Sequence, residues 1–93
     1  MRITFDQAKR DWTLAERGLA FEDSILVFAG PHFTIPDDRQ DYGEPRYLTF
    51  GLLRGRTVTL VWTPRDDARR VISMRYASER ERARFDKHLG RPG

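Results

Sequence analysis

The first part of the chain changes from an alternating to a helical pattern of hydrophobic residues. Ile3 and Phe5 alternate with polar neighbours, which predicts a short opening strand. Asp6 is a favourable helix N-cap and Gly18 a favourable C-terminal stop, so we expect a helix over residues 7–17. The three–four spacing of apolar residues predicts the buried stripe of this helix, which consists of Phe5, Ala8, Trp12 and Ala15.

A second helix is predicted over residues 21–29, with acidic residues in its first turn. Its apolar face consists of Phe21, Ile25 and Phe28. The segment 30–45 that follows contains three prolines and many polar residues, which predicts a long connection. Loops of more than about 12–15 residues are usually functional or mobile, so we expect this segment to be one or the other.

Three strand patterns come next, joined by short turns. Hydrophobic residues alternate over 47–52, the Arg-Gly pair at 54–55 is typical of a tight hairpin, and 57–63 is β-branched and aromatic. Residues 64–67 break the second strand, and 70–76 forms the third. The face that we expect the two helices to bury consists of Leu48, Phe50, Leu52, Val58, Leu60, Trp62, Ile72 and Met74.

The chain closes with a third helix and a short tail. Ser78 and Glu81 have the spacing of a capping box, and the helix pattern runs to about Leu89, before a tail over 90–93. The predicted fold class is α+β, in one domain over residues 1–93. An antiparallel sheet, made of the short N-terminal strand and the three-strand meander, is packed on one face by two helices and leaves its other face polar.

Composition excludes several classes of protein. The chain has no cysteine, which excludes disulfides and thiolate metal sites. No apolar run approaches the ~20 residues that span a membrane. The N-terminus lacks the apolar stretch of a signal peptide. We therefore expect a soluble, cytoplasmic protein with no membrane partner.

Charge is distributed unevenly along the chain. Residues 1–45 hold five basic and nine acidic residues, whereas residues 46–93 hold twelve and five. All but Lys9 and Lys87 of the basic residues are arginine, whose planar fork binds phosphate in a bidentate way. The basic half favours a polyanionic partner. Solvation of an arginine-rich surface explains the same charge equally well.

The positions of individual arginines indicate a candidate phosphate site. In an antiparallel meander, Arg46, Arg65 and Arg70 come to one edge of the sheet, while Arg75 projects from its open face. Guanidinium groups that converge there would hold a phosphodiester and stabilise charge that develops on it. The alternative is surface pairing of these arginines with the neighbouring acids Glu44, Asp66 and Asp67.

RNA cleavage also requires proton transfer, for which the sequence offers few groups. His32 lies in the proline-rich segment and His88 at the end of the last helix, and both are interpreted as surface residues. Glu44 is the best-placed carboxylate base, beside Arg46. Lys9, on the polar side of the first helix, either assists electrostatically or pairs with an acid.

Motifs for other chemistries are absent. The chain has no phosphate-binding glycine loop, no dinucleotide-binding glycine motif and no HExxH zinc motif. Asp37, Asp38 and Asp41 loosely suggest a cation site, but acids in an exposed loop are usually only solvated. We expect no metal and no cofactor.

Taken in order, these segments resemble one known family, the BrnT toxins. No single segment is specific, but their order and spacing together cover residues 5 to about 85. The N-terminal segments are Phe5-Asp6-x-x-Lys9, Gly18-x-x-Phe21-Glu22 and Val27-Phe28. The C-terminal segments are Gly43-Glu44-x-Arg46, Gly51, Thr63-x-Arg65, Arg70-x-Ile72-Ser73-x-Arg75-x-Ala77 and Glu81-Arg82.

The resemblance implies a RelE-like fold whose sheet face holds RNA, and an endoribonuclease that arrests growth as the toxin of a type II toxin–antitoxin pair. It implies a BrnA-type antitoxin with a ribbon-helix-helix part, through which the complex binds operator DNA. The candidate catalytic residues are Lys9, Glu44, Arg46, Arg65 and Arg75. The candidate substrate-binding residues are Arg17, Arg70 and Ser73.

One departure from the family concerns proton transfer. Family members often have a Lys-His pair where this chain has Glu16-Arg17. Arg17 keeps the positive charge there but is a poor base, because its pKa lies above ~12. The alternative function is a non-catalytic module that binds an antitoxin and contributes to a DNA-bound autorepressor complex.

Overall fold

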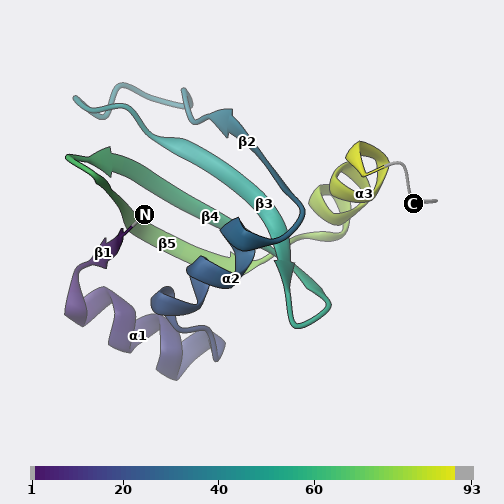
Figure 1. Ribbon diagram of the computed structural model, residues 1–93, viewed down its shortest axis with the longest axis horizontal. Coiled ribbons are helices and arrows are strands. Elements are labelled where there is room, and N and C mark those ends of the chain that lie inside the picture. The colour runs from purple at the N-terminus through teal and green to yellow at the C-terminus, as the bar shows by residue number, and fades with distance from the viewer. Residues whose placement is uncertain (1, 90–93) are drawn as a thin grey trace.

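The computed structural model describes residues 2–89, so the predicted tail over 90–93 lies outside the described residues. Figure 1 shows one sheet with α1 and α2 together on one side and α3 apart from them. The elements in chain order are β1 (Arg2–Phe5), α1 (Gln7–Arg17), the 3-10 helix η1 (Phe21–Asp23), α2 (Ser24–Ala29), β2 (His32–Pro36), β3 (Tyr47–Leu53), β4 (Arg56–Arg65), β5 (Ala68–Tyr76) and α3 (Glu79–His88).

Within residues 2–89 the sheet has five strands in the order β1-β5-β4-β3-β2, which confirms the α+β class. The prediction of an antiparallel sheet is wrong at one edge, because β1 pairs with β5 in parallel. The prediction of a long connection over 30–45 is wrong in its first part, since His32–Pro36 forms a strand that pairs with β3. A strand that ends in a proline is tolerated there because β2 lies at the sheet edge.

The local signals for helix ends and for the first hairpin are confirmed. The Asp6 side chain accepts a hydrogen bond from the Ala8 amide at 3.0 Å, and Gly18 ends α1 with a φ of 70°. The Ser78–Glu81 capping box begins α3. Arg54 and Gly55 form the β3–β4 turn with positive φ, as the tightest hairpins require.

The predicted strand break at residues 64–67 is displaced by two residues. β4 continues through Pro64 and Arg65, which pair with Arg69 and Ala68 of β5. β3 ends opposite Trp62, so beyond that point β4 has a neighbour on one side only. A proline there leaves its missing donor on the free side of the strand, which is why the strand continues.

The face covered by α1 and α2 carries the main core, but not all of the residues expected there. Val58, Leu60 and Met74 are fully buried in it, as predicted. Leu48, Phe50 and Leu52 do not belong to this face, because the two-residue turn pairs Leu53 with Arg56. Odd-numbered residues of β3 therefore share a face with even-numbered residues of β4.

The opposite face has a small core of its own beneath α3. Phe50 stacks on Phe33 of β2 with ring centroids 4.9 Å apart, and Phe33 stacks on Phe85 of α3 at 6.1 Å. Phe85 is fully buried. The alternation predicts that this whole face is open to solvent. Because α3 covers part of it, only the remaining part of the face is open.

On the face of β3 that lies towards α2, the alternating pattern predicts large apolar residues, but Gly51 lies there instead. A Cβ atom at this position would lie 2.6 Å from Cγ1 of Val27 in α2. The absence of a side chain thus lets α2 approach β3 closely.

A β-bulge in β5 changes which residues of that strand face the core. Val61 pairs with Ser73 and Trp62 with Val71, so Ile72 is an additional residue without a partner in β4. Val71 is buried in the main core, whereas Ile72 is only half-buried. The prediction that Ile72 belongs to the core is therefore wrong.

The predicted buried stripe of α1 is also wrong. Trp12 is 53% exposed, and the buried residue of this helix is Thr13. α1 lies beside β5 and is linked to it by the Arg17 guanidinium, which donates to the Met74 carbonyl at 3.1 Å. A helix that touches a sheet along one narrow side leaves the remainder of its apolar residues in solvent.

Candidate active site

The face of the sheet away from α1 and α2 collects several of the predicted arginines. Arg70 pairs with Thr63 and Arg75 pairs with Thr59, and these two threonines lie four positions apart on one face of β4. Arg70 and Arg75 are five positions apart and would face opposite ways in a regular strand. The additional residue Ile72 brings both onto the same face.

Glu44, Arg46 and Arg65 come together at one end of this face, and we refer to them as the Glu44 cluster. The Arg46 Nε atom lies 3.2 Å from one carboxylate oxygen of Glu44, and Arg65 Nη2 lies 3.4 Å from the other. The three side chains are half-exposed, with 31% of Glu44, 25% of Arg46 and 53% of Arg65 accessible. The predicted convergence of Arg46 and Arg65 is thus present, with a carboxylate between them.

The end of the β2–β3 connection that carries this cluster is fixed by hydrogen bonds. Thr63 of β4 donates its hydroxyl to the Pro45 carbonyl at 2.6 Å. The Asp37 amide donates to the Arg46 carbonyl at 2.8 Å. The Arg46 guanidinium also lies over the ring of Tyr42, 4.1 Å from its centroid. Tyr42 was not among the sequence-predicted residues, because no periodic pattern covers it.

Arg75 lies elsewhere on the same face, in an ion pair with Glu81 of α3. Its two terminal nitrogens donate to the two carboxylate oxygens at 2.6 and 2.8 Å. The Glu81 carboxylate also accepts from the Ser78 amide at 2.9 Å. These hydrogen bonds, chiefly that from Arg75, lower the pKa of Glu81 to about 2. The pair therefore joins α3 to the sheet.

Asp37 and Arg39 form a further ion pair that sequence reasoning missed. The Asp37 side chain has no exposed surface and accepts from Arg39 at 2.7 and 2.8 Å. The hydrogen bond from Arg39 lowers the pKa of this carboxyl. Asp41 accepts from the Gly43 amide instead. Among residues 2–89, no group of three or more acidic or histidine side chains lies in an arrangement to hold a metal ion.

The predicted residues of α1 lie across β5 from the Glu44 cluster. Lys9, Arg17 and Ser73 line a pocket of about 250 Å³ at the edge where α1 meets the bulge of β5. Arg17 is held there by the Met74 carbonyl and by the ring of Trp12, 5.0 Å from the guanidinium. Lys9 thus has no contact with Glu44, and the predicted residues form more than one group.

Comparison with known protein families identifies the family to which the chain belongs. A family model described as the ribonuclease toxin, BrnT, of type II toxin–antitoxin systems matches residues 5–81. The chain belongs to the BrnT family. A search of curated proteins finds no match. Within residues 2–89, every helix is too short or too polar to cross a membrane.

Membership of the BrnT family makes the protein a ribonuclease toxin with RNA as its substrate and an antitoxin protein as its partner. The histidines of this BrnT chain are engaged away from the Glu44 cluster. His32 Nδ1 bonds with the Gly30 carbonyl at 2.8 Å, and the His88 ring lies 4.3 Å from that of Phe33. Glu44 is thus the titratable group that contacts both Arg46 and Arg65.

Proposed function

We propose that this BrnT toxin is an endoribonuclease of RelE-like fold that cleaves RNA at the Glu44 cluster without a metal ion. The observation that carries the proposal is the placement of one carboxylate between the guanidinium groups of Arg46 and Arg65 on the uncovered end of the sheet face. A base and two phosphate-binding cations are the groups that cleavage of a phosphodiester by its own 2′-hydroxyl requires.

In the proposed reaction, the Glu44 carboxylate accepts the proton of the ribose 2′-hydroxyl. The 2′-oxygen attacks phosphorus, and the bond from phosphorus to the 5′-oxygen breaks. The products are a 2′,3′-cyclic phosphate and a 5′-hydroxyl, whose proton comes from the Glu44 carboxyl or from water. Arg46 and Arg65 stabilise the negative charge that develops on the phosphoryl oxygens.

The geometry of the Glu44 cluster favours exchange of partners, in which Arg46 and Arg65 leave Glu44 and bind a substrate phosphate. Charge-assisted hydrogen bonds between guanidinium and carboxylate are usually about 2.7–2.9 Å long. The contacts of Glu44 are longer, at 3.2 and 3.4 Å, and lie at the surface, where an ion pair contributes ~0–1 kcal/mol. A phosphate group therefore replaces the carboxylate as the partner of both arginines at little cost.

The other predicted residues are proposed as substrate contacts around this centre. Arg70 of β5 pairs with Thr63 of β4 on one side and with Thr4 of β1 on the other. It therefore lies next to the end of β4 that carries Arg65. Lys9, Arg17 and Ser73 lie beyond it at the α1 side of β5. These groups supply positive charge and a hydroxyl along the path of an RNA strand, and Arg75 adds charge while Glu81 holds it.

The proposed partner is a BrnA-type antitoxin with a ribbon-helix-helix part, through which the pair binds operator DNA. Because cellular RNA is the substrate, the proposed place of action is the cytoplasm. The positive sheet face is the surface on which a neutralising partner gains most, since charge complementarity gives both specificity and fast association.

The test compares purified wild type with Arg46→Ala and Arg65→Ala on a labelled RNA, in the presence of a chelator. We expect wild type to cut, and each variant to cut about 10²–10³-fold more slowly, as loss of one charge-stabilising donor usually costs. Arg54→Ala is the matched control, since Arg54 is an exposed arginine that contacts Asp23 near the β3–β4 turn.

Two results would contradict the proposal. Cleavage by Arg46→Ala and Arg65→Ala at the rate of wild type would show that the active site lies elsewhere. No cleavage by wild type, alone or with ribosomes, together with tight antitoxin binding would favour the non-catalytic module of a repressor complex.

A further inference from the structure

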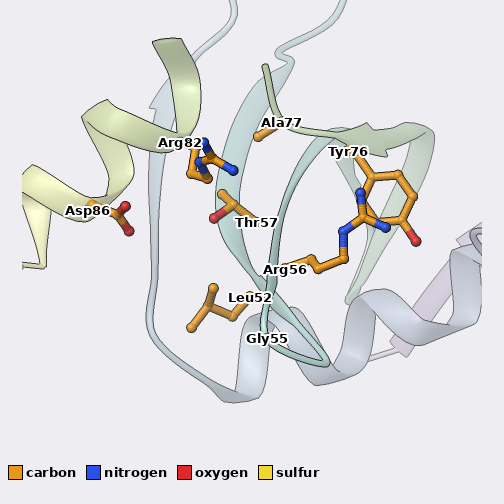
Figure 2. A pocket seen from close by; sticks show the side chains of 8 residues that line it. All are labelled: Leu52, Gly55, Arg56, Thr57, Tyr76, Ala77, Arg82 and Asp86. Atoms are coloured by element: carbon orange, nitrogen blue, oxygen red, sulfur yellow. The ribbon is translucent and has the colours of Figure 1, made fainter. Parts of the chain in front are cut away.

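A second cationic pocket lies at the end of the sheet opposite the Glu44 cluster. It has a volume of about 460 Å³ and lies between α3 and the β3–β4 hairpin. Figure 2 shows Arg82 reaching over Thr57 from α3, while Arg56 extends from the hairpin along the ring of Tyr76. Two guanidinium groups, a hydroxyl and a phenol thus line one cavity.

The guanidinium groups of this pocket differ from those of Arg46, Arg65 and Arg75. In the part of the chain that the structure describes, neither Arg56 nor Arg82 forms an ion pair, whereas Arg46, Arg65 and Arg75 all do. The Arg56 guanidinium is oriented by the Tyr76 ring, 3.7 Å from its centroid. The pocket therefore presents positive charge that no carboxylate of the described residues neutralises by a direct contact.

Acidic side chains near the pocket do not cancel its positive charge. Asp86 also lines it, one turn after Arg82 on α3, and takes part in an interaction of its own. Figure 2 shows its carboxylate apart from the Arg82 guanidinium. The lining thus holds two cations and one anion, which leaves a net positive charge.

On its α3 side the pocket continues the face that carries the proposed active site, whereas Arg56 and Tyr76 line it from the face of Val58. Thr57 lies on the same side of β4 as Thr59 and Thr63, the partners of Arg75 and Arg70. Eight positions separate Thr57 from Arg65, which corresponds to ~26 Å along an extended strand. Arginines thus occur at intervals from the pocket to the Glu44 cluster, with Arg75 and Arg70 between them.

We propose that this pocket binds a backbone phosphate of the RNA substrate, at a distance from the bond that is cut. The proposal rests on the proposed function, because the strand is taken to run from the Glu44 cluster along β4. A row of cations on one face holds successive phosphates of a single strand without reading its bases. Longer RNA then binds more tightly than short RNA.

The experiment measures binding of fluorescent 2′-O-methyl oligonucleotides, which lack the attacking hydroxyl and cannot be cut. A trinucleotide fits the Glu44 cluster alone, whereas a dodecanucleotide reaches the pocket. Arg82→Gln should weaken binding of the dodecanucleotide about ten-fold, because one charge-assisted contact is lost. It should lower the slope of log affinity against log salt by about 0.7 and leave trinucleotide binding unchanged.

The matched controls are two variants of the same helix. Arg80→Gln removes the same charge from an exposed position of α3 that does not line the pocket, and should leave dodecanucleotide binding as in wild type. Arg82→Lys keeps the charge and should restore most of the affinity. Thermal unfolding of each variant separates loss of the contact from loss of the fold.

The outcomes separate this proposal from the proposed function. Equal binding of the dodecanucleotide by Arg82→Gln and wild type would overturn the pocket assignment, even with cleavage at the Glu44 cluster intact. Weakened antitoxin binding by Arg82→Gln with unchanged RNA binding would also overturn it, since the pocket would then belong to the partner protein. Length-dependent loss in Arg82→Gln would support the pocket, even for a protein that does not cut.

Discussion

Two arginine–glutamate groups lie on one face of the sheet, and they differ in geometry. Glu44 is shared between Arg46 and Arg65 through single contacts of 3.2 and 3.4 Å. Glu81 receives both terminal nitrogens of one arginine, Arg75, at 2.6 and 2.8 Å. The first group is a loose bridge between two side chains, whereas the second is a closed bidentate pair.

The surroundings of the two carboxylates differ in the same sense and fit the role that we propose for each. Glu81 is 22% exposed and also completes the capping box of α3, so several hydrogen bonds fix it. Glu44 is 31% exposed and has no partner among the described residues besides its two arginines. Few long contacts leave the Glu44 carboxylate accessible for the proposed proton transfer, whereas many short contacts hold the Glu81 carboxylate in the fold.

The largest expected effect is on cleavage by Glu44→Gln. Glutamine keeps the size of the side chain but cannot accept the 2′-hydroxyl proton, so the rate should fall about 10²–10⁴-fold. Cleavage assays on purified protein measure this, with Glu81→Gln as the matched variant at the other carboxylate. A rate for Glu44→Gln equal to that of wild type would remove Glu44 from the role of base.

The next effect is on stability, and it should be confined to the other group. Glu81→Gln leaves the Arg75 guanidinium without its anion and weakens the capping box, which should cost ~1–3 kcal/mol in the free energy of unfolding. Urea denaturation measures this value. An unchanged unfolding midpoint would show that the pair does not hold α3 to the sheet.

The stabilising effect of Glu81 should also depend on pH. Because its pKa falls from 4.5 to about 2 on folding, the ionised carboxylate stabilises the fold fully above pH 4.5, and this contribution is lost as pH falls towards 2. The difference in stability between wild type and Glu81→Gln should therefore shrink through this window. A difference that stays constant down to pH 2 would contradict the assignment.

The smallest effect should come from breaking the loose bridge. Arg65→Gln removes one contact of Glu44 at the surface, which should change the free energy of unfolding by ~0–1 kcal/mol. The same urea experiment gives this value beside that of Glu81→Gln. A loss as large as that of Glu81→Gln would show that both groups hold the fold, and the comparison would fail.

Sequence reasoning found those features that a few adjacent residues determine. Asp6, Gly18 and the Ser78–Glu81 box set helix ends through hydrogen bonds and φ angles of their own, so the chain reports them directly. The meeting of Arg46 and Arg65 was also predictable, because a meander brings the end of one strand beside the start of its neighbour.

Sequence reasoning failed where partners distant in the chain decide the outcome. Phe50 looked like a core residue of the helix side, but the pairing of Leu53 with Arg56 turns it towards Phe33. The bulge at Ile72 left no local signal, since its cause is the register between β4 and β5. Arg39 lay in a segment without periodicity, and its partner Asp37 is buried only in the folded chain.

The additional residue in β5 has a consequence for how the segment tolerates insertions and deletions. With Ile72 present, Arg70 and Arg75 point outwards while Val71 and Met74 point inwards. Loss of Ile72 would leave the two arginines four positions apart, so a regular strand would still place both of them on the outer face. The stretch therefore tolerates loss of the additional residue, whereas insertion of one more residue would turn one of the two arginines towards the interior unless a second bulge forms.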